Sequence, residues 1–182
     1  CLIRSGERGK CGVRENRDGL LYSLVYEQAY TTAIDPIEKK PLFHFMPGSL
    51  TFSMTTVGCN LFCQFCQNWQ IARPPEPEMP ITGSTLTPEQ IVDRACLNGC
   101  QSIAYTYTEP TIFFEYAYET AKRAHEKNLK NVFVSNGFIT AEAIDTISPY
   151  LDAINIDLKG FSEEYYREIC GGRLQQIGRA HV

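Results

Sequence analysis

Strand-like and helix-like segments alternate along most of this chain, and the alternation limits its possible folds more than any other feature. Strand-like runs lie at residues 50–57, 101–107, 131–137 and 151–159. Helix-like segments come after them, beginning near residues 88, 110, 141 and 163. Strands that are joined by crossover helices pair in parallel. The sequence therefore predicts an α/β fold that is built on a parallel sheet.

The helix near residue 88 has the clearest boundary signals. Thr87 suits the N-cap, Pro88 suits the first turn, and Gln90 can close a capping box with Thr87. The spacing of Cys96 and Cys100 resembles that of a metal-ligand pair. However, Cys96 falls on the apolar stripe of this helix and Cys100 begins the next strand. We therefore expect both cysteines to lie in the core.

Three cysteines, Cys59, Cys63 and Cys66, follow the first strand at a C-x3-C-x2-C spacing. Thiolates bind soft metals, and cysteine sulfur usually holds iron–sulfur clusters. A loop of this length can ligate three irons of a cubane cluster, which leaves the fourth iron open to a substrate or cofactor. Phe62 and Phe65 lie between the ligands and would shield such a cluster from water. Three unrelated thiols, or a zinc site with a distant fourth ligand, are the alternatives.

Ligand-type side chains also end the three later strands. Glu109 follows the second strand, Ser135 and Asn136 lie at the tip of the third, and Asp157 and Lys159 lie at the end of the fourth. In parallel βα folds, chemistry gathers at the carboxyl ends of the strands. We therefore expect these side chains to lie near the cysteine loop.

The fourth strand alternates apolar and polar residues. Ile154, Ile156 and Leu158 would face the helix layer, and the polar residues between them would face the other way. A charged face on a buried strand is costly unless it lines a site. The alternation therefore predicts that Asp157 and Lys159 line one.

Composition narrows the class of protein. At 182 residues, with 43% hydrophobic residues, the chain is long enough for one sizeable globular domain. No apolar run approaches the length of a membrane span, and a net charge of -4 argues against a nucleic-acid surface. The sequence shows no secretory signal. We therefore expect a cytoplasmic protein, with no membrane or nucleic-acid partner, whose eight cysteines are reduced.

The cysteine triplet, with the aromatic Phe65 before its third cysteine, resembles the signature of the radical S-adenosylmethionine (radical SAM) superfamily. From about His44 to Gly172 the chain is similar to the amino-terminal part of that superfamily's core. This resemblance implies a partial (β/α) barrel with about four of six βα units. We expect residues 44–175 to form this truncated core and residues 1–43 to form an incomplete, cysteine-containing lead-in. Residues 176–182 match translated sequencing-adapter sequence, and we expect them to be a non-native tail.

Within the superfamily, the chain looks closest to the pyruvate formate-lyase activating enzyme group, and there to the AmmeMemoRadiSam system radical SAM proteins. The similar stretches are residues 58–60, 66–69, 105–111 and 157–160. The resemblance implies that Cys59, Cys63 and Cys66 hold a [4Fe-4S] cluster whose open iron binds SAM.

The same resemblance implies further contacts to SAM. Glu109 would hold its amino group, and Phe65, tethered between two cluster ligands, would pack on its adenine. The remaining expected contacts are Ser135, Asn136, Asp157 and Lys159, the last two near the SAM carboxylate and a cation. Tyr107 and Thr108 stand where the family has two glycines.

The implied function is reductive cleavage of SAM to give a 5′-deoxyadenosyl radical. Such an enzyme needs a reducing donor such as flavodoxin or ferredoxin, and in the activating-enzyme group the radical removes hydrogen from a partner protein. The alternative is a zinc-binding interaction module that uses Cys1 and Cys11 with the triplet. An electron-transfer ferredoxin module would need a fourth cysteine close to the triplet in the sequence, and none lies there.

Overall fold

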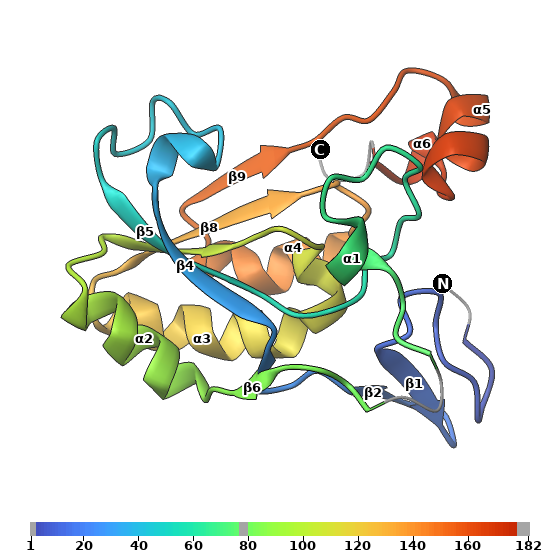
Figure 1. Ribbon diagram of the computed structural model, residues 1–182, viewed down its shortest axis with the longest axis horizontal. Helices are drawn as coiled ribbons and strands as arrows, with labels where there is room; N and C mark the ends of the chain where they lie inside the picture. Colours follow the sequence, from blue (N-terminus) through green and yellow to red (C-terminus); the bar gives the residue numbers. More distant parts are fainter. Residues whose placement is uncertain (1–2, 77–79, 178–182) are drawn as a thin grey trace.

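A five-stranded sheet forms the centre of the molecule, whose computed structural model describes residues 3–76 and 80–177. Its strands, in spatial order, are Thr31–Pro36 (β4), Leu50–Thr55 (β5), Ser102–Tyr105 (β7), Lys130–Ser135 (β8) and Ala153–Ile156 (β9). β5, β7, β8 and β9 pair in parallel, whereas β4 is antiparallel to β5. The predicted parallel α/β fold is confirmed (Figure 1).

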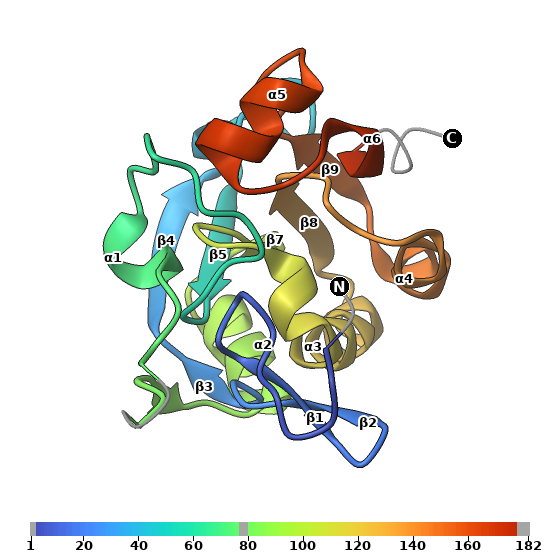
Figure 2. The ribbon, with the colours of Figure 1, turned by 90° about the vertical axis from the view of Figure 1, so that its right-hand side faces the viewer.

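Three helices, α2 (Pro88–Leu97), α3 (Phe114–Glu126) and α4 (Ala141–Ile147), connect the parallel strands. α2 and α3 lie side by side against one face of the sheet (Figures 1 and 2). The predicted capping box begins α2. Thr87 Oγ1 accepts a hydrogen bond from Gln90 N at 3.2 Å, and Thr87 N donates to Gln90 Oε1 at 3.0 Å.

Shorter elements surround the sheet. They are β1 (Arg14–Arg17), β2 (Leu20–Ser23), β3 (Gln28–Ala29), α1 (Trp69–Ala72), β6 (Ser84–Thr85), α5 (Glu163–Tyr165) and α6 (Leu174–Ile177). β1 and β2 form a hairpin, and β3 pairs with β6. A π-helical turn, Tyr166–Cys170, follows α5. No helix in the described ranges is both long and apolar enough to cross a membrane.

The first predicted domain bound separates β4 from the rest of its sheet, and the second cuts α6. β4 belongs to the main sheet although it precedes residue 44. α6 includes Gln176 and Ile177, and Ile177 is buried beside Leu61 and Tyr166. Residues 178–182 and Cys1 lie outside the described residues. The division at 43/44 and the non-native tail stay predictions.

Three predictions of burial were wrong. α2 buries Ile91, Val92 and Ala95, whereas Cys96, one position further round the helix, faces solvent. Cys100 is buried, as expected. Ile154 and Leu158 are 36% and 47% exposed. β9 is an edge strand of the described sheet, so no further strand lies beside it on its outer edge.

Candidate active site

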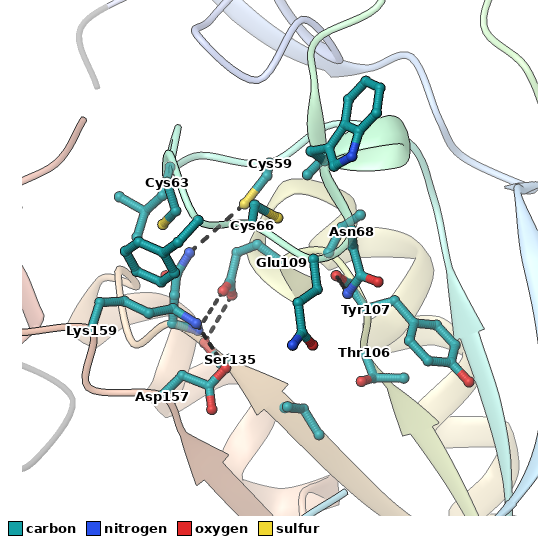
Figure 3. A pocket seen from close by; sticks show the side chains of 18 of the residues that line it. Cys59, Cys63, Cys66, Asn68, Thr106, Tyr107, Glu109, Ser135, Asp157 and Lys159 are labelled. Atoms are coloured by element: carbon teal, nitrogen blue, oxygen red, sulfur yellow. Dashed lines mark hydrogen bonds and ion pairs between the residues drawn. The ribbon is translucent and has the colours of Figure 1, made fainter. Parts of the chain in front are cut away.

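A cavity of about 420 Å³ opens where the parallel strands end. It is lined by all nine side chains that the sequence nominates, which are Cys59, Cys63, Phe65, Cys66, Glu109, Ser135, Asn136, Asp157 and Lys159. Figure 3 shows the three thiols together on one side of this cavity. The structure therefore brings the predicted residues to one place, whereas their individual roles stay predictions.

The cysteine loop is fixed at both its entry and its middle. Gly58 has a φ of +90°, and a Cβ there would lie 2.5 Å from the carbonyl oxygen of Cys11, so only glycine fits. Phe62 N donates to the carbonyl oxygen of Cys170 at 2.7 Å. Gln64 N donates in the same way to Ile169 at 3.0 Å. These two backbone hydrogen bonds therefore hold the cysteine loop against the π-helical turn.

The three thiols are free and partly buried. Burial, and then the neighbouring Glu109, raise the pKa of Cys59 to about 12. Burial, and then Cys170, raise the pKa of Cys63 to about 12. Within residues 3–76 and 80–177, no three His, Cys, Asp or Glu side chains gather closely enough to hold one metal ion. Three cysteine thiols on one side of the cavity are the donor type that usually holds iron–sulfur clusters.

Two other cysteines bear on the alternatives. Cys11 is buried in the main core and does not line the cavity, so it does not complete a zinc site with the triplet. Cys170 is buried, and Cys63 packs against the same small cluster of side chains, which makes Cys170 a fourth thiol beside the triplet. No sequence pattern indicated this contact, because Cys170 lies far along the chain from the triplet.

Glu109 is a buried carboxylate, 1% exposed, that caps the 3₁₀ turn Pro110–Phe113. It accepts hydrogen bonds from Ser135 Oγ at 2.8 Å and from Asn136 N at 2.7 Å. Thr111 adds a bond from its backbone N at 3.3 Å and one from Oγ1 at 3.2 Å. Burial raises the pKa of Glu109 to about 7, although these donors act in the opposite direction. The site therefore fixes the position of a carboxylate, and this carboxylate has no cationic partner among the described residues.

Asn60 ties the cysteine loop to this carboxylate. Its Oδ1 accepts from Asn136 Nδ2 at 2.8 Å, and its Nδ2 donates to Thr111 Oγ1 at 3.1 Å. Asn136 Nδ2 also lies 3.9 Å from Cys59 Sγ. No sequence pattern predicted a role for Asn60, although its place next to Cys59 was a local signal.

Asp157 and Lys159 form an ion pair at 2.9 Å on the same side of the cavity as Cys63 (Figure 3). Burial alone would lower the pKa of Lys159, but the bond to Asp157 and the nearby Cys63 and Cys59 raise it. The Lys159 backbone N donates to Tyr166 Oη at 2.8 Å. The charged face predicted for the end of the fourth strand therefore lines the cavity.

A further polar group lies across the cavity from this pair. Tyr107 adopts a φ of +65°, a conformation that glycine favours. Its hydroxyl donates to Asp35 Oδ2 at 2.6 Å, and Asp35 also accepts bonds from Lys39, Lys40 and Ser53. Burial would raise the pKa of Asp35, but these donors hold it well below its usual range. We call these five residues the Asp35 cluster, which no sequence pattern predicted.

The fold and the cavity together define an α/β protein with a cysteine-based cofactor site at the carboxyl ends of its parallel strands. Residues 53–179 match the family model of the radical SAM superfamily. Because the match covers more than half of the chain, the protein belongs to that superfamily. Membership implies SAM and an iron–sulfur cluster as cofactors.

The chain is also similar to individual known proteins. The chain is 44% identical over 177 residues to an uncharacterized protein of Methanocaldococcus jannaschii, MJ0808, and the match covers 97% of this chain and 52% of the relative. The chain thus spans about half the length of that relative. Among solved structures, QueE from Escherichia coli is similar with a TM-score of 0.57 at 11% identity, over 86% of this chain and 70% of QueE. A structure of TYW1 with a lysine-pyruvate adduct has a TM-score of 0.48 at 18% identity, covering 82% of this chain and 59% of that one.

Proposed function

We propose that this protein binds a [4Fe-4S] cluster and SAM in the cavity and cleaves SAM reductively. The observation that carries the proposal is the convergence of Cys59, Cys63 and Cys66 with the buried Glu109 on one cavity. The three thiols would hold three irons and leave the fourth open to the amino and carboxylate groups of SAM. When bound and reduced, the cluster would supply the one electron needed to break a C–S bond of SAM, which would give methionine and a 5′-deoxyadenosyl radical.

The residues of the chain position SAM and exclude water. Glu109, which lacks a cationic partner among the described residues, would accept the positively charged amino group. Lys159 would meet the SAM carboxylate, with Asp157 orienting it. Ser135 and Asn136 fix the Glu109 carboxylate, and Asn136 also reaches Cys59, so the two halves of the site share one hydrogen-bond network.

Anaerobic reconstitution tests this proposal. We expect a brown, oxygen-sensitive protein whose electron paramagnetic resonance spectrum, after reduction, changes when SAM is added. Reduced protein with SAM should also form 5′-deoxyadenosine. Cys63→Ala should lose the cluster, whereas the matched control Cys96→Ala, at an exposed cysteine outside the cavity, should keep it. A colourless protein that binds zinc tetrahedrally, or a bound cluster whose spectrum ignores SAM, would contradict the proposal.

We infer further that the radical acts on a partner protein, because the chain resembles the activating-enzyme group, in which the target is a glycine of a partner protein. The radical would take a hydrogen atom from a glycine of the partner and become 5′-deoxyadenosine. A flavodoxin or ferredoxin would supply the electron. Incubation with cell protein labelled with deuterated glycine should place deuterium in 5′-deoxyadenosine. Unlabelled 5′-deoxyadenosine formed at the same rate would refute hydrogen abstraction from a glycine of a partner protein.

A further inference from the structure

The Asp35 cluster carries more hydrogen-bond donors than acceptors. Asp35 Oδ2 accepts from Lys40 at 2.6 Å, Ser53 at 2.8 Å and Tyr107 at 2.6 Å, and Oδ1 accepts from Lys39 at 2.7 Å. Each lysine ammonium has three N–H donors. Lys39 uses one of its donors within the described part of the chain, and Lys40 uses two, the second at 3.5 Å to the Tyr107 hydroxyl. A group that binds here must therefore accept hydrogen bonds.

The cluster also carries surplus positive charge. Two ammonium groups share the single carboxylate of Asp35, and Asp35 itself is only 3% exposed. The Lys39 side chain is 60% exposed, and Lys39 and Lys40 both line the cavity. Arg73 lines the same cavity and adds a third cation. A ligand in the cavity could thus contact the Lys39 ammonium group without contacting the buried Asp35 carboxylate.

The position of the cluster separates it from the side of the cavity assigned to SAM. Figure 3 shows Tyr107 across the cavity from Asp157 and Lys159. Asn68, two positions after Cys66, donates from Nδ2 to the carbonyl oxygen of Tyr107 at 2.9 Å. The cluster therefore lies in the same cavity as the thiols and is tied to the chain that carries them, as a substrate site for a short-range radical reaction requires.

We propose that Lys39 and Arg73 bind an anionic group of the substrate, a carboxylate or a phosphate, beside the reacting centre. The proposal rests on the proposed function, because it names the substrate chemistry of that same cavity. A purely structural cluster needs only one lysine to neutralise Asp35, and Lys40, 1% exposed, already does so. Lys39 is surplus to that purpose and remains available to a ligand.

Calorimetry on the reconstituted protein with SAM bound tests the proposal. Inorganic phosphate and malonate are titrated separately, with chloride at matched ionic strength as the reference, because screening alone weakens charge interactions. Fluorescence of Trp69, the only tryptophan of the chain and a residue of the cavity lining, reports binding inside the cavity. We expect one of the two anions to bind saturably, and which one binds distinguishes a phosphate from a carboxylate substrate.

Lys39→Gln should raise the dissociation constant of that anion about tenfold or more, equivalent to about 1.4 kcal/mol. Lys130→Gln is the matched control, because Lys130 is 47% exposed and paired with Asp152 outside the cavity. SAM affinity and formation of 5′-deoxyadenosine should stay unchanged in both variants, so failure of the proposed function is recognised separately.

Three results would overturn the proposal. The first is that neither anion binds more tightly than chloride. The second is an equal loss of anion binding in the two variants, which would indicate general surface charge. The third is a loss of SAM affinity in Lys39→Gln, which would make the cluster a part of the SAM site.

Discussion

Replacing Glu109 with Gln is expected to remove a pH dependence from the stability of this fold. Burial raises the pKa of Glu109 from an ordinary 4.5 to about 7. Between these values the folded chain keeps a proton that the unfolded chain has released, so the free energy of unfolding falls as the pH rises. At about 1.36 kcal/mol per pKa unit, the fall amounts to roughly 2 to 3 kcal/mol between about pH 5 and pH 8.

The Gln variant has no ionisable group at position 109, so this pH dependence disappears. The variant also loses one hydrogen bond that Glu109 makes. Its amide nitrogen cannot accept from Asn136 N, which Glu109 Oε2 does at 2.7 Å, and this costs about 1–3 kcal/mol at every pH. The variant should therefore be less stable than the wild type near pH 5 by about that amount. Near pH 8 the two proteins should be almost equally stable, because the buried negative charge has been removed.

Urea unfolding followed by circular dichroism, under anaerobic conditions and at several pH values, measures this difference. Glu164→Gln, at an exposed position in α5, serves as the control for the substitution itself. A stability difference between the wild type and Glu109→Gln that is constant from about pH 5 to pH 8 would show that the reasoning about the buried carboxylate is wrong.

Other predictions address cofactor binding. SAM affinity should fall as the pH drops below about 7, because Glu109 then loses the charge that meets the amino group; calorimetry across pH checks this. Phe65→Ala should weaken SAM binding by about 1–3 kcal/mol if the ring stacks on adenine, and a change below about twofold would leave it a shield for the cluster. Lys159→Met should raise the SAM dissociation constant about tenfold with the cluster intact; lower thermal stability at unchanged affinity would instead mark a structural ion pair with Asp157.

The repeated alternation of the sequence was sufficient to predict the parallel strands and their helices. It missed β4, since an antiparallel edge strand needs no crossover helix and the six residues Thr31–Pro36 end in a proline. The exposure of Ile154 was also missed, because periodicity gives the face of a residue but not whether another element covers that face.

The residues of the site also fall into those that the sequence predicts and those that it does not. Cys59, Glu109 and Lys159 could be brought together from sequence because the carboxyl ends of parallel strands meet at one edge of a sheet. Asp35 and Cys170 could not, because each reaches the cavity region from a segment distant in the chain and has no local motif. Only the packed fold shows that they are neighbours of predicted residues.

The two backbone hydrogen bonds from the cysteine loop to the π-helical turn bear on the order in which the chain assembles. Phe62 N and Gln64 N donate to the carbonyl oxygens of Cys170 and Ile169. The cysteine loop therefore cannot form these two hydrogen bonds until that later segment has left the ribosome. Closing so long a segment has an entropic cost that is recovered only when the later strands have paired. During synthesis the thiols are therefore made early but held in place late, and a cluster delivered in between would meet a loop without its backbone support.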